Sequence, residues 1–186
     1  VTAAAITALS LKQDDGTGTT SLNGAANTSG AAGVNVVNET IAVNAGIAAT
    51  GGTVTLTADT ATLTLAAAGD ITADGAVSLT GNTGISTAGD VTTSGDNVTY
   101  NSGATLTGDI TIDTGAGLGD VTFSGLLDGT TAGTEDLTMT AGAGDVTFTG
   151  AVGGGTRLGA IDITRADDVT AAAITALSLK QDDGTG

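Results

Sequence analysis

Aspartate is the residue type whose placement in this sequence most suggests chemistry. A four-residue motif, Gly-Asp-(Val/Ile)-Thr, recurs along the chain. Its aspartates are Asp70, Asp90, Asp109, Asp120 and Asp145. If successive motifs stack as neighbouring strands, their carboxylates lie about 5 Å apart, and Ca²⁺ takes carboxylate oxygens as ligands. The motif therefore predicts these five residues as Ca²⁺ ligands, with an alternative role in starting turns and keeping the surface hydrated.

Other chemistry has less support in the sequence. The chain has no His and no Cys, so the usual general base and the thiol nucleophile are missing. Adjacent aspartates occur at 14–15, 167–168 and 182–183, with Arg165 close to one pair. Adjacent residues of a strand face opposite sides, so such pairs do not by themselves form a site. The glycine-rich run 150–159 lacks the Lys-Ser/Thr of a phosphate-binding loop. We therefore expect no enzyme activity and no required cofactor.

The elements that carry these residues are predicted to be short strands. Polar and apolar residues alternate in runs of three to six residues bounded by Gly, Asn or Asp, a pattern typical of half-buried strands. Only residues 3–9 could instead form a helical turn. The alternating runs are 53–57, 62–65, 111–113, 136–140 and 162–164.

The spacing of the motif predicts how the strands are arranged. Most of its copies lie about twenty residues apart, and the interval of eleven between Asp109 and Asp120 is interpreted as a partial turn of the same winding. Repeats of this length with short strands indicate a β-solenoid. The prediction is an all-β, right-handed parallel β-helix with about 20–25 residues per coil. A β-sandwich is the alternative fold. It is disfavoured because only 2% of the residues are aromatic, fewer than a sandwich core usually contains.

A longer repeat defines the organisation of the chain. Residues 169–186 are identical to residues 1–18, VTAAAITALSLKQDDGTG. We expect residues 1–186 to form a single continuous solenoid, with 1–168 as one full period of roughly seven to eight coils and 169–186 as the start of the next. This chain is then expected to be part of a longer tandem array.

Charge limits the partners. The formal net charge is −16, with only four Lys and Arg residues, which disfavours nucleic acid and anionic lipid. No apolar run reaches the roughly 18 residues of a membrane helix. We expect no nucleic-acid partner and no membrane insertion. The expected partners are adjacent repeats of the same chain or identical chains along a filament, together with cell-surface or matrix glycans.

The runs GDVTFTGAVGGGTRLGAIDIT and GGTVTLTADTATLTLAAAGDITADGAVSLTG resemble repeats of giant secreted bacterial β-solenoid proteins, the filamentous-haemagglutinin-like and autotransporter-type adhesins. The resemblance implies export to the cell surface and a rigid stalk or filament that acts in adhesion or biofilm matrix. One alternative is a binding module for Ca²⁺, glycan or ice, because outward Thr residues such as those at 53, 55 and 57 form local arrays. A polysaccharide-active enzyme is the remaining alternative.

Overall fold

The alternating runs form strands with the predicted burial pattern. In β9 (Val54–Ala58), the side chains of Val54, Leu56 and Ala58 are buried, and those of Thr55 and Thr57 face outward. The other four predicted runs overlap β10 (Leu63–Leu65), β17 (Ile110–Asp113), β20 (Leu137–Thr140) and β22 (Leu158–Ala166). The alternating pattern therefore identifies both the strands and their buried faces.

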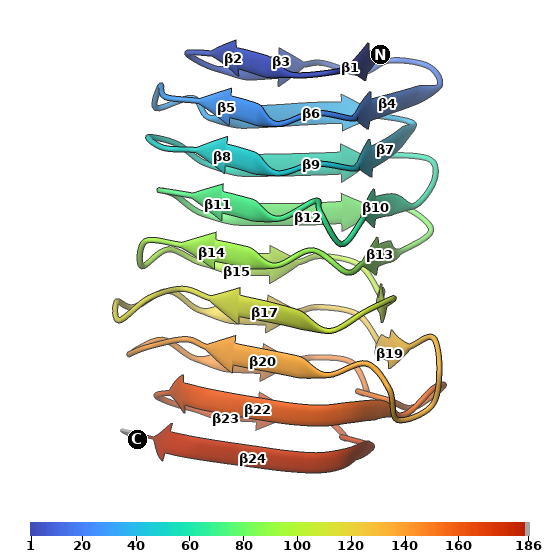
Figure 1. Ribbon diagram of the computed structural model, residues 1–186. Coiled ribbons are helices and arrows are strands. Elements are labelled where there is room, and N and C mark those ends of the chain that lie inside the picture. Colours follow the sequence, from blue (N-terminus) through green and yellow to red (C-terminus); the bar gives the residue numbers. More distant parts are fainter. Residues whose placement is uncertain (185–186) are drawn as a thin grey trace.

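The strands wind into a right-handed parallel β-solenoid in the computed structural model, which describes residues 1–184 (Figure 1). The chain makes about eight turns of about 22 residues each. The number of residues per turn is the difference in residue number between in-register neighbours of adjacent coils. It is smallest from Leu158 to Ala176 and largest from Ile112 to Met139. The predicted fold class is confirmed, and these two values fall just outside the predicted range of coil lengths.

Three parallel sheets form the sides of the solenoid. Sheet A contains β1 (Thr2–Ala3), β4 (Thr19–Leu22), β7 (Thr40–Val43), β10, β13 (Ile85–Thr87), β16 (Ala104–Leu106) and β19 (Leu127–Gly129). Sheet B contains β2 (Ile6–Ala8), β5 (Ala26–Thr28), β8 (Ile47–Ala49), β11 (Ile71–Ala73), β14 (Val91–Thr93), β17, β20, β22 and β24 (Ala176–Gly184). Sheet C contains β3 (Leu11–Gln13), β6 (Val34–Asn38), β9, β12 (Val77–Gly81), β15 (Val98–Tyr100), β18 (Val121–Phe123), β21 (Val146–Phe148) and β23 (Val169–Ala171).

The core consists of columns of identical or similar side chains. In sheet C one inward column begins with Leu11 and then contains only valine, because the register aligns Leu11 with Val34, Val54, Val77, Val98, Val121, Val146 and Val169. The next inward column contains the aromatic residues. Phe123 stacks between Tyr100 and Phe148, with ring centroids 4.6 and 5.5 Å away. Regular stacking therefore fills a narrow core with few aromatic residues.

Two alternatives from the sequence are wrong. Residues 3–9 form no helical turn; they contribute to β1 and β2. The β-sandwich is excluded because all strand pairings among residues 1–184 are parallel. The eleven-residue interval is a partial turn, as predicted: Asp109 precedes β17 in sheet B, and Asp120 precedes β18 in sheet C of the same coil.

The two copies of the eighteen-residue segment lie on different sides of the solenoid. The first copy starts in sheet A, where Thr2 pairs with Ser21, whereas Val169–Ala171 of the second copy forms β23 in sheet C. From β1 the chain completes seven turns to the bridge at Val152, in line with sheet A, and then passes along sheets B and C. The sequence period is therefore seven turns and two further sides, not a whole number of turns.

Candidate functional site

The five motif aspartates occupy two corners of the solenoid. Asp70, Asp90 and Asp109 each lie directly before a strand of sheet B. Asp120 and Asp145 each lie directly before a strand of sheet C. The structure therefore brings the predicted residues together as two separate columns, one at each corner.

In the sheet B column, each carboxylate accepts a hydrogen bond from the backbone of the next coil. The N–H of Asp90 donates to Asp70 Oδ1 at 2.9 Å, and the N–H of Thr111 donates to Asp90 Oδ1 at 2.7 Å. The N–H of Asp136 donates to Asp109 Oδ1 at 2.9 Å. Asp136 continues the column, because its Oδ1 accepts the N–H of Ala160 at 2.6 Å.

The sheet C column has the same arrangement. Asp120 Oδ1 accepts the N–H of Asp145 at 3.0 Å, and Asp145 Oδ1 accepts the N–H of Asp168 at 3.1 Å. The column begins with Asn97, whose Oδ1 accepts the N–H of Asp120 at 2.9 Å. An amide oxygen therefore fills the same role as a carboxylate oxygen at this corner.

Backbone carbonyls complete a second bond at each step. The carbonyl of Asp120 accepts the N–H of Val98 at 2.8 Å, and that of Asp145 accepts the N–H of Val121 at 2.8 Å. Asp90, Asp120 and Asp145 thus each join the coil before them through their N–H and carbonyl, and the coil after them through their side chains. Unpaired N–H groups at corners are costly unless an acceptor reaches them. The motif aspartates satisfy these N–H groups where the sheets are interrupted.

In four of its five copies the motif glycine is required by close approach of the backbones; at Gly108 the nearest neighbour of an added Cβ is the side chain of Ala88. A Cβ added to Gly144 would lie 2.4 Å from the carbonyl oxygen of Gly119, and one added to Gly89 would lie 2.7 Å from that of Gly69. Such distances are not tolerated without moving the backbone. Each position of Gly-Asp-(Val/Ile)-Thr therefore has a structural role. The glycine allows close contact between coils, the aspartate forms the hydrogen bond at the corner, the Val or Ile side chain points into the core, and the Thr side chain points outward.

The geometry does not assemble a metal cluster. Within residues 1–184, no three acidic side chains lie close enough together to hold a metal ion. Successive carboxylates of one column are a coil apart, and one oxygen of each already accepts a backbone N–H. Ca²⁺ binding by Asp70, Asp90, Asp109, Asp120 or Asp145 stays a prediction, to be tested by melting with and without a chelator.

Replacement of Asp120 tests the structural role of the columns. We expect Asp120→Ala to lower the free energy of unfolding by about 1.5 kcal/mol, because the N–H of Asp145 loses a charged acceptor. Asp120→Asn keeps an acceptor, as at Asn97, and should change the free energy by less than about 0.5 kcal/mol. Urea unfolding of both variants measures the difference. Equal losses in the two variants would contradict the assignment of the side-chain oxygen as the stabilising group.

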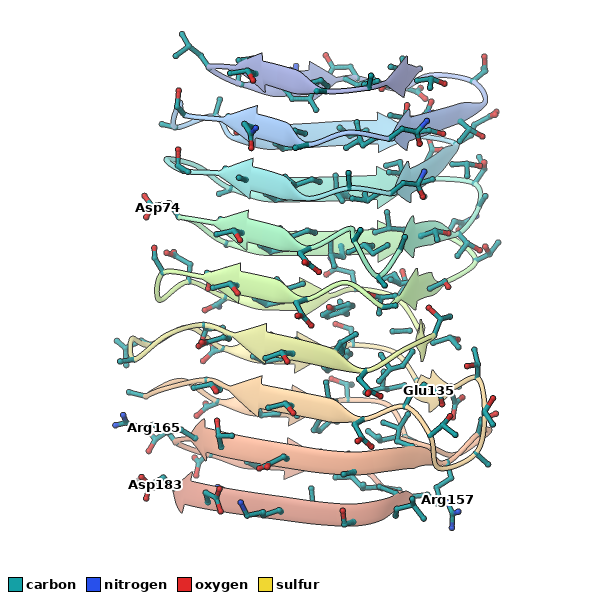
Figure 2. All side chains as sticks on the ribbon, in the orientation of Figure 1. Asp74, Glu135, Arg157, Arg165 and Asp183 are labelled. Atoms are coloured by element: carbon teal, nitrogen blue, oxygen red, sulfur yellow. The ribbon has the colours of Figure 1, made fainter. Side chains whose placement is uncertain are left out.

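The adjacent aspartate pairs do not converge on a catalytic site. Asp14 and Asp182 are equivalent positions of the repeat, and each forms an exposed ion pair, Lys12–Asp14 at 2.8 Å and Lys180–Asp182 at 2.5 Å. The hydrogen bond that Lys180 donates to Asp182 raises the pKa of Lys180. Arg165 aligns with Asp183 of the neighbouring strand at the C-terminal end (Figure 2). These charges lie on the outer surface, where such pairs contribute little.

Glu135 is a polar residue that sequence reasoning missed. It lies in the loop between β19 and β20 and is only 6% exposed (Figure 2). Its carboxylate accepts hydrogen bonds from Thr130 Oγ1 at 2.5 Å and from the Thr131 N–H at 3.1 and 3.2 Å. Desolvation opposes ionisation, but these bonds together with Thr134 outweigh it and hold the pKa of Glu135 below its ordinary value. Glu135 therefore organises its loop as an anion.

The lowered pKa predicts a pH dependence of stability. Because the folded-state pKa of Glu135 lies below the unfolded value of about 4.3, its contribution is complete above that value and is lost as pH falls through the folded-state pKa. Glu135→Gln should cost about 1 kcal/mol near neutral pH. The difference from the wild type should shrink as the pH falls below about 4.3 and through the lowered folded-state pKa, as followed by urea midpoints. A difference independent of pH would contradict this role.

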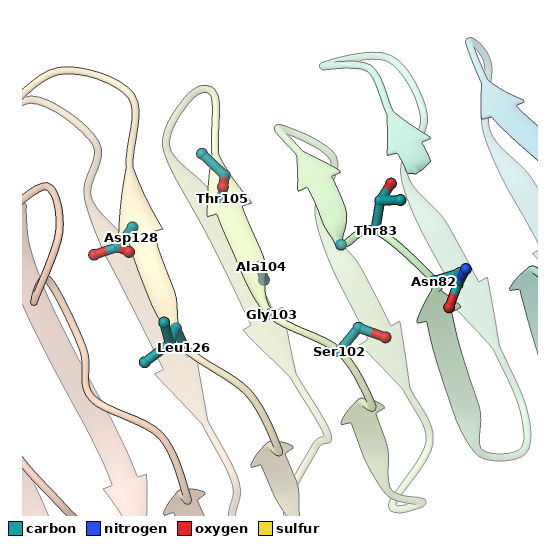
Figure 3. A pocket seen from close by; sticks show the side chains of 9 residues that line it. Asn82, Thr83, Ser102, Gly103, Ala104, Thr105, Leu126 and Asp128 are labelled. Atoms are coloured by element: carbon teal, nitrogen blue, oxygen red, sulfur yellow. The ribbon is translucent and has the colours of Figure 1, made fainter. Parts of the chain in front are cut away.

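One hollow lies on the outer surface, across sheet A and the corner before it (Figure 3). It has a volume of about 320 Å³, and three successive coils line it through Asn82, Thr83, Ser102, Thr105, Leu126 and Asp128, with backbone from Gly84, Gly103 and Ala104. Leu126 is 58% exposed. Asp128 Oδ1 accepts the N–H groups of Gly155 and Thr156 at 2.8 and 3.1 Å. Hydroxyl, amide and carboxylate groups thus surround one exposed apolar side chain.

The outward face of sheet C carries a continuous column of hydroxyl groups. The register aligns Thr55, Ser78, Thr99, Thr122, Thr147 and Thr170. The outward column of sheet B is less uniform, since Asp113 follows Thr92 in register. Of the threonines predicted as a local array, Thr55 lies in this column, whereas Thr57 aligns with Val37 and Thr80 and Thr53 lies outside β9.

Comparison with known proteins gives no significant match: no family model, no curated protein and no solved structure resembles the chain closely enough to be assigned. The part of the chain that the structure describes contains no helix that is long and apolar enough to cross a membrane. The β-solenoid fold is consistent with a repetitive structural or binding module.

Proposed function

We propose that this chain is a segment of a long extracellular bacterial fibre or giant surface adhesin. In this proposal it serves as a rigid stalk or filament in adhesion or biofilm matrix, and its role is mechanical and not catalytic. The resemblance of its recurring Gly-Asp-Val-Thr motifs to the repeats of secreted β-solenoid adhesins supports an extracellular location.

The observation that carries the proposal is the continuity of the three parallel sheets. Sheets B and C run from the first coil to the last described strands, and the isolated bridge at Val152 continues the line of sheet A. Backbone hydrogen bonds between coils therefore point along the axis, in the direction of a pulling force. The aspartate columns add hydrogen bonds in the same direction at two corners.

Electron microscopy with antibodies against residues 1–186 tests the proposal on cells that produce the protein. Labelled filaments or labelled cell surfaces are the expected result. Label confined to the cell interior would overturn the extracellular role. Pulling experiments on the chain add a mechanical measurement, because rupture along stacked parallel strands should require many hydrogen bonds to break together.

A second candidate function is glycan binding by the hollow beside Leu126. The observation that favours it is the combination of hydrogen-bonding groups with an exposed apolar side chain across three coils. Ligand sites commonly combine apolar surface with a few placed polar groups. A neutral sugar could then be bound on the side of a stalk without any change in the solenoid.

Gly103→Arg tests this second candidate. A Cβ at Gly103 has its nearest neighbour at 3.6 Å, so the backbone accepts a side chain there that fills the hollow. Glycan-array binding by the wild-type chain that is lost in Gly103→Arg, with unchanged melting, is the expected result. Equal binding by both proteins would place any glycan site elsewhere.

A further inference from the structure

Asn23 and Gly24 form the only Asn-Gly pair in the sequence, and Asn23 is exposed at the corner between β4 and β5. The side-chain amide of an asparagine is open to attack by the backbone nitrogen of the residue that follows it. Glycine permits this attack most readily, because it has no Cβ to hinder the approach and adopts more backbone conformations than other residues. The pair is therefore a candidate site for a covalent change, deamidation.

The neighbouring coil polarises the side-chain carbonyl of Asn23. Leu22 pairs in register with Val43, so Asn44 occupies the position next to Asn23. Asn44 Nδ2 donates a hydrogen bond to Asn23 Oδ1 at 2.7 Å. Negative charge develops on this oxygen when a nucleophile attacks the amide carbon, and a donor placed where charge develops stabilises the transition state. Asn44 thus activates the side chain of Asn23.

The backbone nitrogen of Gly24, the nucleophile, is not engaged in the hydrogen bonds between coils. Within residues 1–184 the Gly24 N–H makes no hydrogen bond. Asn23 Nδ2, the group that must leave, makes none either in this part of the chain. The atom that attacks and the atom that departs are therefore both free to react.

Other junctions of this kind are blocked by the stacking of the coils. The N–H of Gly75, which follows Asp74, donates to the carbonyl of the preceding coil at 3.0 Å. The N–H of Val98, which follows Asn97, donates to the carbonyl of Asp120 at 2.8 Å. A nitrogen held in such a bond is withdrawn from attack. The corner after β4 is different because its glycine nitrogen is free and its asparagine carbonyl is activated.

We propose that Asn23 is a site of spontaneous deamidation in the folded chain, activated by Asn44. The Gly24 nitrogen forms a bond to Asn23 Cγ, the bond from Cγ to Nδ2 breaks, and the proton of the Gly24 N–H leaves with Nδ2 as ammonia. The product is a cyclic imide, which water then opens at one of its two carbonyls to leave a carboxylate at position 23. This inference goes beyond the proposed stalk function and does not depend on it.

The two products of the imide differ in their effect on the coils. Opening at the former side-chain carbonyl gives aspartate, whose carboxylate still accepts the N–H of Asn44. Opening at the backbone carbonyl gives isoaspartate, which adds a methylene to the main chain directly after the N–H that bonds to the Ala3 carbonyl. The corner is then too long for its in-register position. In a stalk that is not renewed, this product accumulates with age and loosens the coil that carries it.

Peptide mapping of the folded chain after incubation in mildly alkaline buffer tests the proposal. Digestion after Lys12 and Glu39 releases residues 13–39, and fragmentation locates the modified asparagine. We expect the mass increase of deamidation at Asn23 before any other asparagine of the chain, and cleavage by hydroxylamine before Gly24 while the imide is present. If Asn23 is modified in the urea-unfolded chain but not in the folded one, the fold protects the pair and the proposal is overturned.

Asn44→Ala separates activation by the fold from the reactivity of the Asn-Gly pair itself. Loss of the donor should slow deamidation of Asn23 by about fivefold, the effect on a rate of one hydrogen bond of ordinary net strength. Asn101→Ala is the matched control, because Asn101 Nδ2 forms a similar bond between coils, to Ser78 Oγ at 2.9 Å, and does not contact Asn23. It should leave the rate unchanged. A rate in Asn44→Ala equal to or above that of the wild type would refute the activating role of Asn44.

Discussion

Gly144→Ala will lower the free energy of unfolding by about 3 kcal/mol, at the upper end of what overpacking costs. The new Cβ would lie 2.4 Å from the carbonyl oxygen of Gly119 and 2.6 Å from its carbonyl carbon. Both contacts are with backbone, so no side chain can move aside. The coils must separate, which weakens the hydrogen bond between Asp145 and Asp120 that follows directly. Urea unfolding followed by circular dichroism measures the loss.

Gly154→Ala is the matched control, because this glycine is exposed and has only Ala151 Cβ at 3.4 Å from the added atom. It should leave stability within about 0.5 kcal/mol of the wild type. If the two variants were equally stable, close approach of the coils at the motif glycine would not be what excludes a side chain there.

The sequence predicted the strands well because their information is local. Alternation at residues 53–57 states which side chains point inward, and the glycines and aspartates on either side state where the strand ends. The same alternation does not indicate in which of the three sheets a strand lies. The faces depend on the lengths of successive corners, and only the structure shows that residues 2–3 lie in sheet A and residues 169–171 in sheet C.

The candidate site was predicted in part. The five motif aspartates lie at corners and stack, as the recurring motif suggested, but the motif could not show that they form two columns. Asn97 and Asp136 belong to the same columns and lack the motif, because any oxygen acceptor at the corner serves. Glu135 was missed since its bonds to Thr130 and Thr131 depend on how one loop closes.

The rotation of the period bears on which function an array of these repeats can have. Sheet C carries a column of hydroxyl groups from Thr55 to Thr170, of the kind that an ice-binding face would require, and Asn35 and Lys12 precede it in the same register. Because one period is seven turns and two sides, a following period in the proposed array would place its equivalent column on a different side of the solenoid. No side of an extended array is then uniform, and its negative charge is distributed around the axis. This arrangement favours an isolated stalk over lateral binding to an extended flat surface.

Phe123→Ala will lower the free energy of unfolding by about 4 kcal/mol, as expected for an aromatic side chain removed from a core. Phe123 is 1% exposed and lies between the rings of Tyr100 and Phe148, so its loss leaves a cavity that stiff parallel strands cannot close. Leu118→Ala, at a residue 76% exposed, should change stability by less than about 0.5 kcal/mol.

The same stack predicts a change of opposite sign at Tyr100. Burial, with a smaller effect of Asp90, raises the pKa of Tyr100, and the neighbouring Thr87 hydroxyl offsets this only in part. The Tyr100 hydroxyl makes no hydrogen bond of normal geometry. Tyr100→Phe removes that buried polar group, keeps the ring, and should raise the free energy of unfolding by about 1 kcal/mol. Thermal and urea unfolding of the three variants measure both signs. A loss of stability in Tyr100→Phe would mean that the hydroxyl is satisfied in solution, and a loss below about 1 kcal/mol in Phe123→Ala would mean that the stack does not hold the coils together.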